Sequence, residues 1–139
     1  MILLLLLKFL LLVELAKLEI WFCVLTLILA HTLSRFSAVY ITFTESYVRE
    51  DELSKAKPIA KKLSVKNFIV ASIWLVPAFL LFQHPIFVLV LIPVFLMTFY
   101  LKRYFKKWIG GYTGDCLGAT QQVNEVITLL SCLALWKFI

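Results

Sequence analysis

The four glycines of the chain all fall in one short stretch, "GGYTGDCLG", residues 110–118, within a sequence dominated by Leu, Phe, Val and Ile. Glycine reaches backbone angles closed to other residues and leaves its N–H group accessible. The segment "GGYTGD" can therefore form a concave nest of amide donors suited to a phosphate or pyrophosphate. The candidate phosphate-binding residues are Gly110, Gly111, Thr113, Gly114 and Gly118.

The surroundings of this stretch support anion binding but leave an alternative open. We predict a helix from Ala119 onward, whose positive end would attract an anion. Four basic residues just upstream would add to the attraction, namely Lys102, Arg103, Lys106 and Lys107. The stretch is not a Walker loop, because no lysine follows its last glycine. In the alternative, Asp115 caps the last helix while Gly114 and Gly118 let another helix approach closely. Spacing alone favours neither interpretation.

Glu125 is an ionisable residue within the last apolar segment. Gln121, Asn124 and Glu125 share one helical face by their spacing. A charged group inside a membrane span costs about 2.5–3.5 kcal/mol on insertion scales, so it usually faces a bundle interior or a wet cavity. Glu125 is therefore a site candidate, and the alternative is a hydrogen bond that packs helices together.

Two cations also lie within apolar segments. Arg35 shares a helical face with His31, and its guanidinium can either hold a phosphate bidentately or reach the lipid headgroups. Lys8 interrupts "LLLLLKFLLL", where a lysine needs a carboxylate or an anionic ligand unless it lies near the end of a short helix. Three acidic residues are candidate partners for Arg35, namely Glu45, Asp115 and Glu125.

The composition indicates that a membrane surrounds the elements that position these residues. Of the 139 residues, 63% are hydrophobic and 16% are charged, whereas roughly 45–50% of a soluble domain is apolar. We predict an all-α, polytopic transmembrane bundle, a single domain over residues 1–139, with about five spanning helices. Pro77 and Pro93 are expected to kink their helices. The predicted spans are Ile2–Val13, Leu18–Ile41, Asn67–Phe82, Pro85–Leu101 and Ala119–Phe138.

The basic residues indicate membrane orientation rather than binding to nucleic acid. Ten of the 14 Lys and Arg residues lie in two segments, around "KAKPIAKK" and "KRYFKKW". Both segments fall on one side of the membrane if "QHP" forms a turn on the other. The positive-inside rule then places that side in the cytoplasm. We expect a multi-pass protein of the cytoplasmic membrane whose site faces the cytoplasm. The three cysteines and two histidines lack the spacing of a zinc site or a disulfide framework.

The extended stretch "GGYTGDCLGATQQVNE" closely resembles the C-terminal signature of the adenosylcobinamide-GDP ribazoletransferases, the cobalamin synthase family of polytopic membrane enzymes. Upstream, "LLKFLLL" with Lys8 and "LSRFSAV" with Ser34 and Arg35 are similar to the corresponding helices of that family. The matching positions of the signature are Gly110, Gly111, Thr113, Gly114, Asp115, Leu117, Gly118 and Ala119, followed by Glu125.

The resemblance implies a phosphoryl-transfer reaction. Such enzymes join adenosylcobinamide-GDP to α-ribazole or its 5′-phosphate with release of GMP, and they require magnesium (Mg²⁺). The resemblance implies that the glycine amides, Arg35 and Lys8 neutralise phosphate charge. It also implies that Asp115 and Glu125 bind metal or orient the nucleophile.

One feature of the family is not found in this sequence: the aspartate-rich motif H-x-D-G-x-A-D-x-x-D-G, which the resemblance implies as the magnesium site. The chain resembles the C-terminal half of the enzyme, beginning within a helix, and we expect activity only together with an N-terminal half. Two alternatives stay open, an inactive remnant and a small membrane binding or transport subunit. The apolar runs "PIFVLVLIPVF" and "VITLLSCLALW" disfavour a polar path across the membrane.

Overall fold

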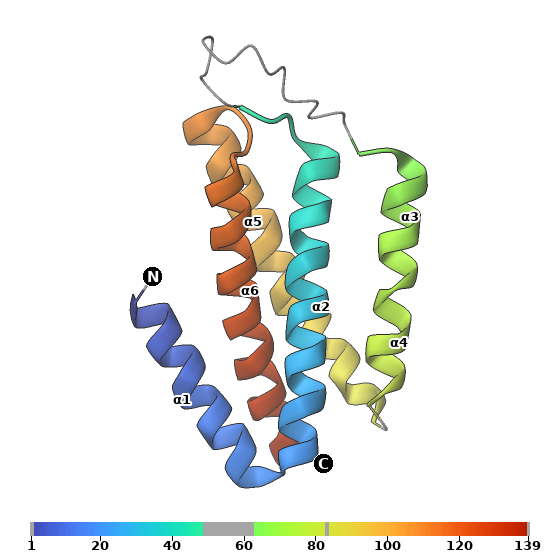
Figure 1. Cartoon of the computed structure of the whole chain (residues 1–139), viewed down its shortest axis with the longest axis vertical. Helices are drawn as coiled ribbons and strands as arrows, with labels where there is room; N and C mark the ends of the chain where they lie inside the picture. The colour runs from blue at the N-terminus through green and yellow to red at the C-terminus, as the bar shows by residue number, and fades with distance from the viewer. Residues whose placement is uncertain (1, 49–62, 83, 139) are drawn as a thin grey trace.

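The computed structural model describes residues 2–48, 63–82 and 84–138, and most of these residues are helical (Figure 1). This confirms the all-α prediction for the described residues. The longer helices are α1 (Ile2–Leu18), α2 (Ile20–Thr44), α5 (Leu91–Ile109) and α6 (Gly114–Leu135). The shorter ones are α3 (Val65–Ile73), α4 (Leu75–Leu80) and the 3-10 turns η1 (Pro85–Val90) and η2 (Trp136–Phe138).

The helices form one bundle in which α2 packs against α1, α3, α4, α5 and α6. In Figure 1, α2 and α5 rise while α3, α4 and α6 descend, and α1 starts partway up the bundle and runs down to the lower end. The core consists of aliphatic side chains from several helices, with Leu15, Leu29, Val90 and Leu129 fully buried. Many large apolar side chains are instead exposed on the outside, as expected for a surface that faces lipid tails.

Two helical segments, Ile20–Thr44 and Pro85–Ile109, are long and apolar enough to cross a membrane. The predicted count of five spans is not confirmed. α1 has only 17 residues, and the first half of α6 is polar. α3 and α4 together form a shorter apolar stretch, Val65–Leu80. Hydropathy marks the apolar part of a helix but not where the helix ends, so α2, α5 and α6 each extend beyond their predicted bounds.

Proline explains the irregular middle of the chain, where the helices are interrupted near Pro77 and Pro93. A proline has no N–H to donate to the carbonyl four residues earlier, and its ring crowds that carbonyl. For Pro77 that carbonyl belongs to Ile73, where α3 ends before α4 begins. For Pro93 it belongs to Leu89, which lies in the 3-10 turn η1 rather than in α5.

Apart from Lys8 and Arg35, which lie midway along the bundle, the described basic residues lie toward its two ends. Because α3 begins and α5 ends at the upper end in Figure 1, most of these residues lie there, beside the α5–α6 connection. They are Lys66, Lys102, Arg103, Lys106 and Lys107. Lys17 and His84 lie in or beside elements of the lower end. Arg49 and the "KAKPIAKK" segment are outside the described residues.

Candidate functional site

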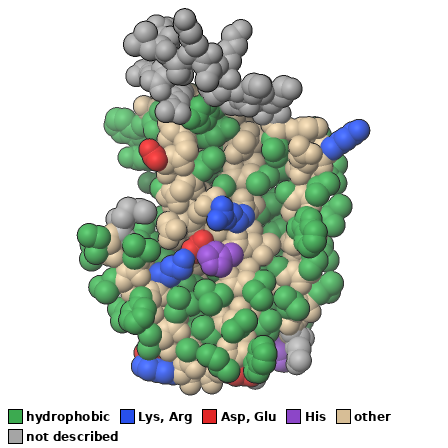
Figure 2. Space-filling model, viewed as in Figure 1, with side chains coloured by type: hydrophobic (Ala, Val, Ile, Leu, Met, Phe, Trp, Pro, Cys, Tyr) green, Lys and Arg blue, Asp and Glu red, His purple; other side chains and the backbone are tan. Residues whose placement is uncertain are grey.

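A charged cluster surrounds Glu125 where three helices meet. Glu125 of α6 is only 4% exposed, and Lys8 of α1 forms an ion pair with its Oε2 atom. From α2, the His31 Nδ1 atom lies 3.1 Å from Oε1 and the Ser34 hydroxyl lies 3.3 Å from the same oxygen. Figure 2 shows blue, red and purple side chains gathered midway down one face of the molecule. We refer to Lys8, His31, Ser34 and Glu125 as the Glu125 cluster.

Helical spacing and charge balance explain why this cluster forms. His31 and Ser34 are three residues apart on α2, so both face α6. Removing a carboxylate from water costs several kcal/mol unless it is paired and hydrogen-bonded. The Lys8 ammonium balances the charge of Glu125, and the Ser34 hydroxyl supplies a donor. The predicted need of Lys8 for a carboxylate within the bundle is thereby confirmed.

A buried hydrogen-bond network next to the cluster links α5 to α6 and α2. The Asn124 Nδ2 atom donates to Thr98 Oγ1 at 2.8 Å. Thr98 Oγ1 in turn lies 2.7 Å from the Val94 carbonyl oxygen and 3.1 Å from Ser37 Oγ. Because Asn124 precedes Glu125 in α6, this network fixes the rotation of α6 and therefore the direction in which Glu125 points.

The connection between α5 and α6 is paired with the segment that follows α2. Gly110 ends α5 in the left-handed region, with φ of +82°. The Tyr112 amide donates to the Ser46 carbonyl at 3.1 Å, and the Val48 amide donates to the Tyr112 carbonyl at 2.9 Å. A Cβ atom on Gly111 would lie 2.2 Å from the Ser46 carbonyl oxygen. Gly110 and Gly111 thus both have structural reasons to be glycine.

α6 begins at Gly114 rather than at the predicted Ala119. Its N-cap is Thr113, whose Oγ1 atom accepts a hydrogen bond from the Cys116 amide at 3.4 Å. The interpretation of Asp115 as the cap is therefore wrong, because the extended backbone of Thr113 already presents an oxygen to the first turn. Asp115 lies inside that turn and is exposed.

Gly114 and Gly118 are not packed against another helix among the described residues. A Cβ atom built on either glycine meets no atom within 4 Å. The alternative in which these two glycines admit a neighbouring helix is therefore not realised within the described part of the chain. Both face open space at the upper end of α6.

The structure does not bring every candidate residue to the Glu125 cluster. Asp115 and Glu125 are ten residues apart on one helix, a separation of about 15 Å along its axis at 1.5 Å per residue. The glycine connection lies farther up the bundle still. Arg35 is exposed one turn from His31 on α2, and no ion pair involves it within the described residues. Glu45 pairs with Lys106 at 3.2 Å instead of with Arg35.

His31 and Ser34 are the members of the cluster that the sequence did not select as site residues, and His31 is the less expected of the two because Ser34 lies in a segment that resembles the family. The i, i+4 relation of His31 to Arg35 was visible, but nothing local to α2 indicates that the ring meets a carboxylate 94 residues away. The contact depends on how α2 packs against α6. The side chain of His31 remains 56% exposed while its Nδ1 atom touches Glu125.

The described residues do not fit a magnesium site. They contain no group of three or more His, Cys, Asp or Glu side chains placed to hold a metal ion. Glu125 already contacts the Lys8 ammonium, the Ser34 hydroxyl and the His31 ring. Asp115 is too far along α6 to share an ion with it.

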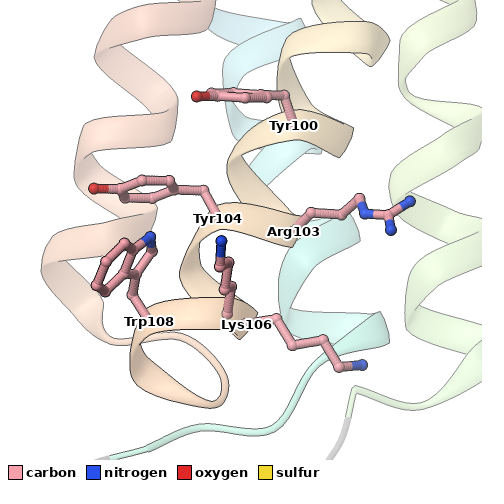
Figure 3. A pocket seen from close by; sticks show the side chains of 6 residues that line it. Tyr100, Arg103, Tyr104, Lys106 and Trp108 are labelled. Carbon is pink, nitrogen blue, oxygen red and sulfur yellow. The ribbon is translucent and has the colours of Figure 1, made fainter.

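A second surface feature is a shallow, open hollow on the outer face of α5. Tyr100, Tyr104 and Trp108 project to the same side of the helix, while Arg103 projects to the other (Figure 3). The ring centroids of neighbouring members lie 6.4 Å and 6.2 Å apart along this row. Lys106 and Lys107 also line the hollow. Aromatic and basic side chains together are typical of a membrane–water interface, so this hollow does not compete with the Glu125 cluster as a reaction site.

The sequence of this chain is similar to those of one family of known proteins. The family profile described as Cobalamin-5-phosphate synthase matches residues 1–133. The adenosylcobinamide-GDP ribazoletransferase of Shewanella frigidimarina is 44% identical over 141 residues, which cover 95% of this chain and 51% of the relative. The protein of the same name from Leptospira interrogans is 38% identical, with 96% of this chain and 52% of the relative covered. The chain spans about half the length of these curated relatives. No solved structure matches it.

Proposed function

Because the chain belongs to the cobalamin-5-phosphate synthase family, we propose that it takes part in joining adenosylcobinamide-GDP to α-ribazole or its 5′-phosphate, with release of GMP. The observation that carries this proposal is the Glu125 cluster. Lys8, Ser34 and Glu125 come from the three separate segments that resemble the family, and each places a side chain at the same point of the bundle.

The charges of the cluster suit a phosphate ester as substrate. Glu125 and Lys8 balance each other, so the nearby Arg35 supplies a positive charge that no described carboxylate neutralises. A guanidinium binds phosphate bidentately and keeps its charge at any physiological pH. We propose that Arg35 binds the pyrophosphate of the substrate, and that Lys8 holds Glu125 in place rather than contacting phosphate itself.

The start of α6 is proposed as a second contact for the substrate. Gly114 and Gly118 leave open space beside the first turn of the helix, where free N–H groups and the helix dipole favour an anion. Asp115 is exposed at the same turn. A substrate that carries a corrinoid, a pyrophosphate and a guanosine is extended enough to reach from the Glu125 cluster toward this end of the bundle.

We propose that Mg²⁺ is held by the N-terminal half that the family resemblance implies, through its aspartate-rich motif. When bound, the ion would neutralise charge on the phosphates and on the departing GMP. The described residues of this chain contribute no comparable group of ligands. The exposed Arg35 and the open Gly114 and Gly118 mark the face that this half would cover.

We also propose that the protein is multi-pass and lies in the cytoplasmic membrane with the α5–α6 connection in the cytoplasm. The basic residues near that connection support this orientation through the positive-inside rule. The row formed by Tyr100, Tyr104 and Trp108 supports it as well, because such rings contact membrane lipid at the level of the headgroups.

The experiment produces this chain in membranes with and without the N-terminal half of the Shewanella frigidimarina relative. Incorporation of α-ribazole into the corrinoid is then measured with adenosylcobinamide-GDP and Mg²⁺. We expect product only when both halves are present. Product from this chain alone would overturn the need for the other half. No product from the pair would refute the enzymatic function and leave the two alternatives, an inactive remnant and a small membrane binding or transport subunit.

A further inference from the structure

We infer that His31 accepts the proton of the attacking α-ribazole hydroxyl, with Glu125 orienting the imidazole ring. This inference rests on the proposed function, because it assigns a role within that reaction. It is carried by the contact between the His31 ring and the Glu125 carboxylate and by the exposure of the rest of the ring.

The contact leaves one ring nitrogen available. The Nδ1 atom of His31 lies 3.1 Å from Glu125 Oε1, and in a neutral imidazole one nitrogen carries the proton while the other accepts. A carboxylate at Nδ1 selects the form in which Nδ1 carries the proton, so Nε2 becomes the acceptor. Because the side chain is 56% exposed, a substrate hydroxyl can approach the ring.

The charges around the ring fit a proton acceptor. Lys8 already balances Glu125, so the carboxylate does not need a protonated His31 to compensate it. When Nε2 takes the proton, the imidazolium that forms lies beside the same carboxylate and is stabilised by it. Arg35 lies one turn from His31 along α2, and in the proposed reaction its charge is offset by the pyrophosphate.

The other polar groups of the cluster are poorer acceptors. The Lys8 ammonium has no lone pair to offer while it is paired with Glu125. Ser34 is fully buried, and its hydroxyl points toward Glu125 and the His31 carbonyl oxygen. Glu125 itself is 4% exposed and shares its oxygens among three neighbours. Asp115 lies about 15 Å along α6 from Glu125.

The step balances without an added reactant. The hydroxyl oxygen forms a bond to the phosphorus on the corrinoid side, and the bond from that phosphorus to the bridging oxygen breaks. GMP departs with the bridging oxygen and its electron pair. The hydroxyl proton passes to Nε2 of His31 and from there to water, which regenerates the neutral ring.

The test uses the two-half enzyme described above and compares His31→Gln with His84→Gln. His84 is the only other histidine of the chain and is exposed near the lower turn, far from the cluster. We expect H31Q to lower kcat by about 10²–10⁴-fold, the usual contribution of a positioned general base. The KM for adenosylcobinamide-GDP should change less than threefold, and H84Q should behave as the unsubstituted pair.

Two further measurements separate a proton acceptor from a structural residue. The acid-side fall of kcat with decreasing pH should disappear in H31Q, and added imidazole should restore activity to His31→Ala. A change in KM alone, an unchanged kcat or an unaltered pH profile would overturn the inference. If H31Q does not reach the membrane, the rescue experiment on H31A is the test: restored activity supports His31 as the proton acceptor, and no restoration overturns that role. An active unsubstituted pair with a fully active H31Q refutes only the role of His31, whereas an inactive unsubstituted pair refutes the proposed function as well.

Discussion

Replacing Lys8 with methionine tests whether the Glu125 cluster holds three helices together. Lys8→Met keeps a long, flexible side chain but leaves the Glu125 carboxylate, 4% exposed, without its cation. Removing one partner of a buried ion pair costs about 3–5 kcal/mol, because the remaining charge stays buried and unpaired. Ser34 and His31 still contact the carboxylate, so we expect the free energy of unfolding to fall by about 3 kcal/mol, the lower end of that range.

The assay is a double-mutant cycle on the unfolding of the purified protein in detergent. Glu125→Gln removes the charge, so K8M should cost much less in the E125Q background, and we expect a coupling energy above about 1 kcal/mol. Interhelical hydrogen bonds in membranes average about 0.6 kcal/mol in such cycles. The coupling energy between Lys8 and Glu125 should exceed this average, because the pair is ionic as well as hydrogen-bonded.

Lys17 provides the matched control. It pairs with Glu14 at 2.7 Å, but both side chains are more than half exposed. Lys17→Met should therefore cost no more than about 1 kcal/mol, as is usual for exposed pairs. Equal effects of K8M and K17M, or additive effects of K8M and E125Q, would show that the Lys8–Glu125 contact does not hold α1 against α6.

Three further substitutions, two of them with a control substitution, test the glycine connection and the buried network by thermal unfolding. Gly111→Ala should destabilise the protein by roughly 1–3 kcal/mol, because its Cβ would overlap the Ser46 carbonyl oxygen. The control, Gly114→Ala, should be tolerated because this position faces open space. Equal melting temperatures of the two variants would contradict the pairing of the α5–α6 connection with the segment that follows α2. Thr113→Ala should lower the free energy of unfolding by about 1 kcal/mol, because the N-cap of α6 is lost. If Asp115→Ala destabilises the protein more than Thr113→Ala does, Thr113 is not the cap. Thr98→Val should lower the free energy of unfolding by about 1–3 kcal/mol, because the buried side-chain amide of Asn124 loses its acceptor. An unchanged melting temperature would show that this network does not stabilise the bundle.

The sequence alone identified the features that depend on short-range rules. The apolar composition and the lengths of the apolar runs predicted helices, and each predicted segment is mostly helical where the structure describes it, with breaks at Glu19 and Trp74. Pro77 and Pro93 predicted the interruptions near Trp74 and in η1, because the missing N–H acts on a carbonyl only four residues away. Lys8 and Glu125 were recognisable as site candidates, since a charge in an apolar segment stands out without knowledge of its partner.

Element ends were predicted less well, for a physical reason. Helices continue through polar residues past the ends of the apolar runs, so α5 runs to Ile109 and α6 starts at Gly114. The cap of α6 also depends on which residue adopts the extended backbone before the helix, and that residue is Thr113 rather than Asp115. A pattern of residue types does not specify that choice.

Only the tertiary structure decided which candidates meet. Lys8 and Glu125 are separated by 117 residues, and His31 reaches the same carboxylate through the packing of α2 against α6. Asp115 shares a helix with Glu125, yet the rise of that helix keeps the two about 15 Å apart. Gly111 and Gly114 look equivalent in the sequence, but one lies against the Ser46 carbonyl and the other faces open space. Contacts of this kind depend on how whole helices rotate and pack against one another, and the residues on either side of a position in the chain do not determine that.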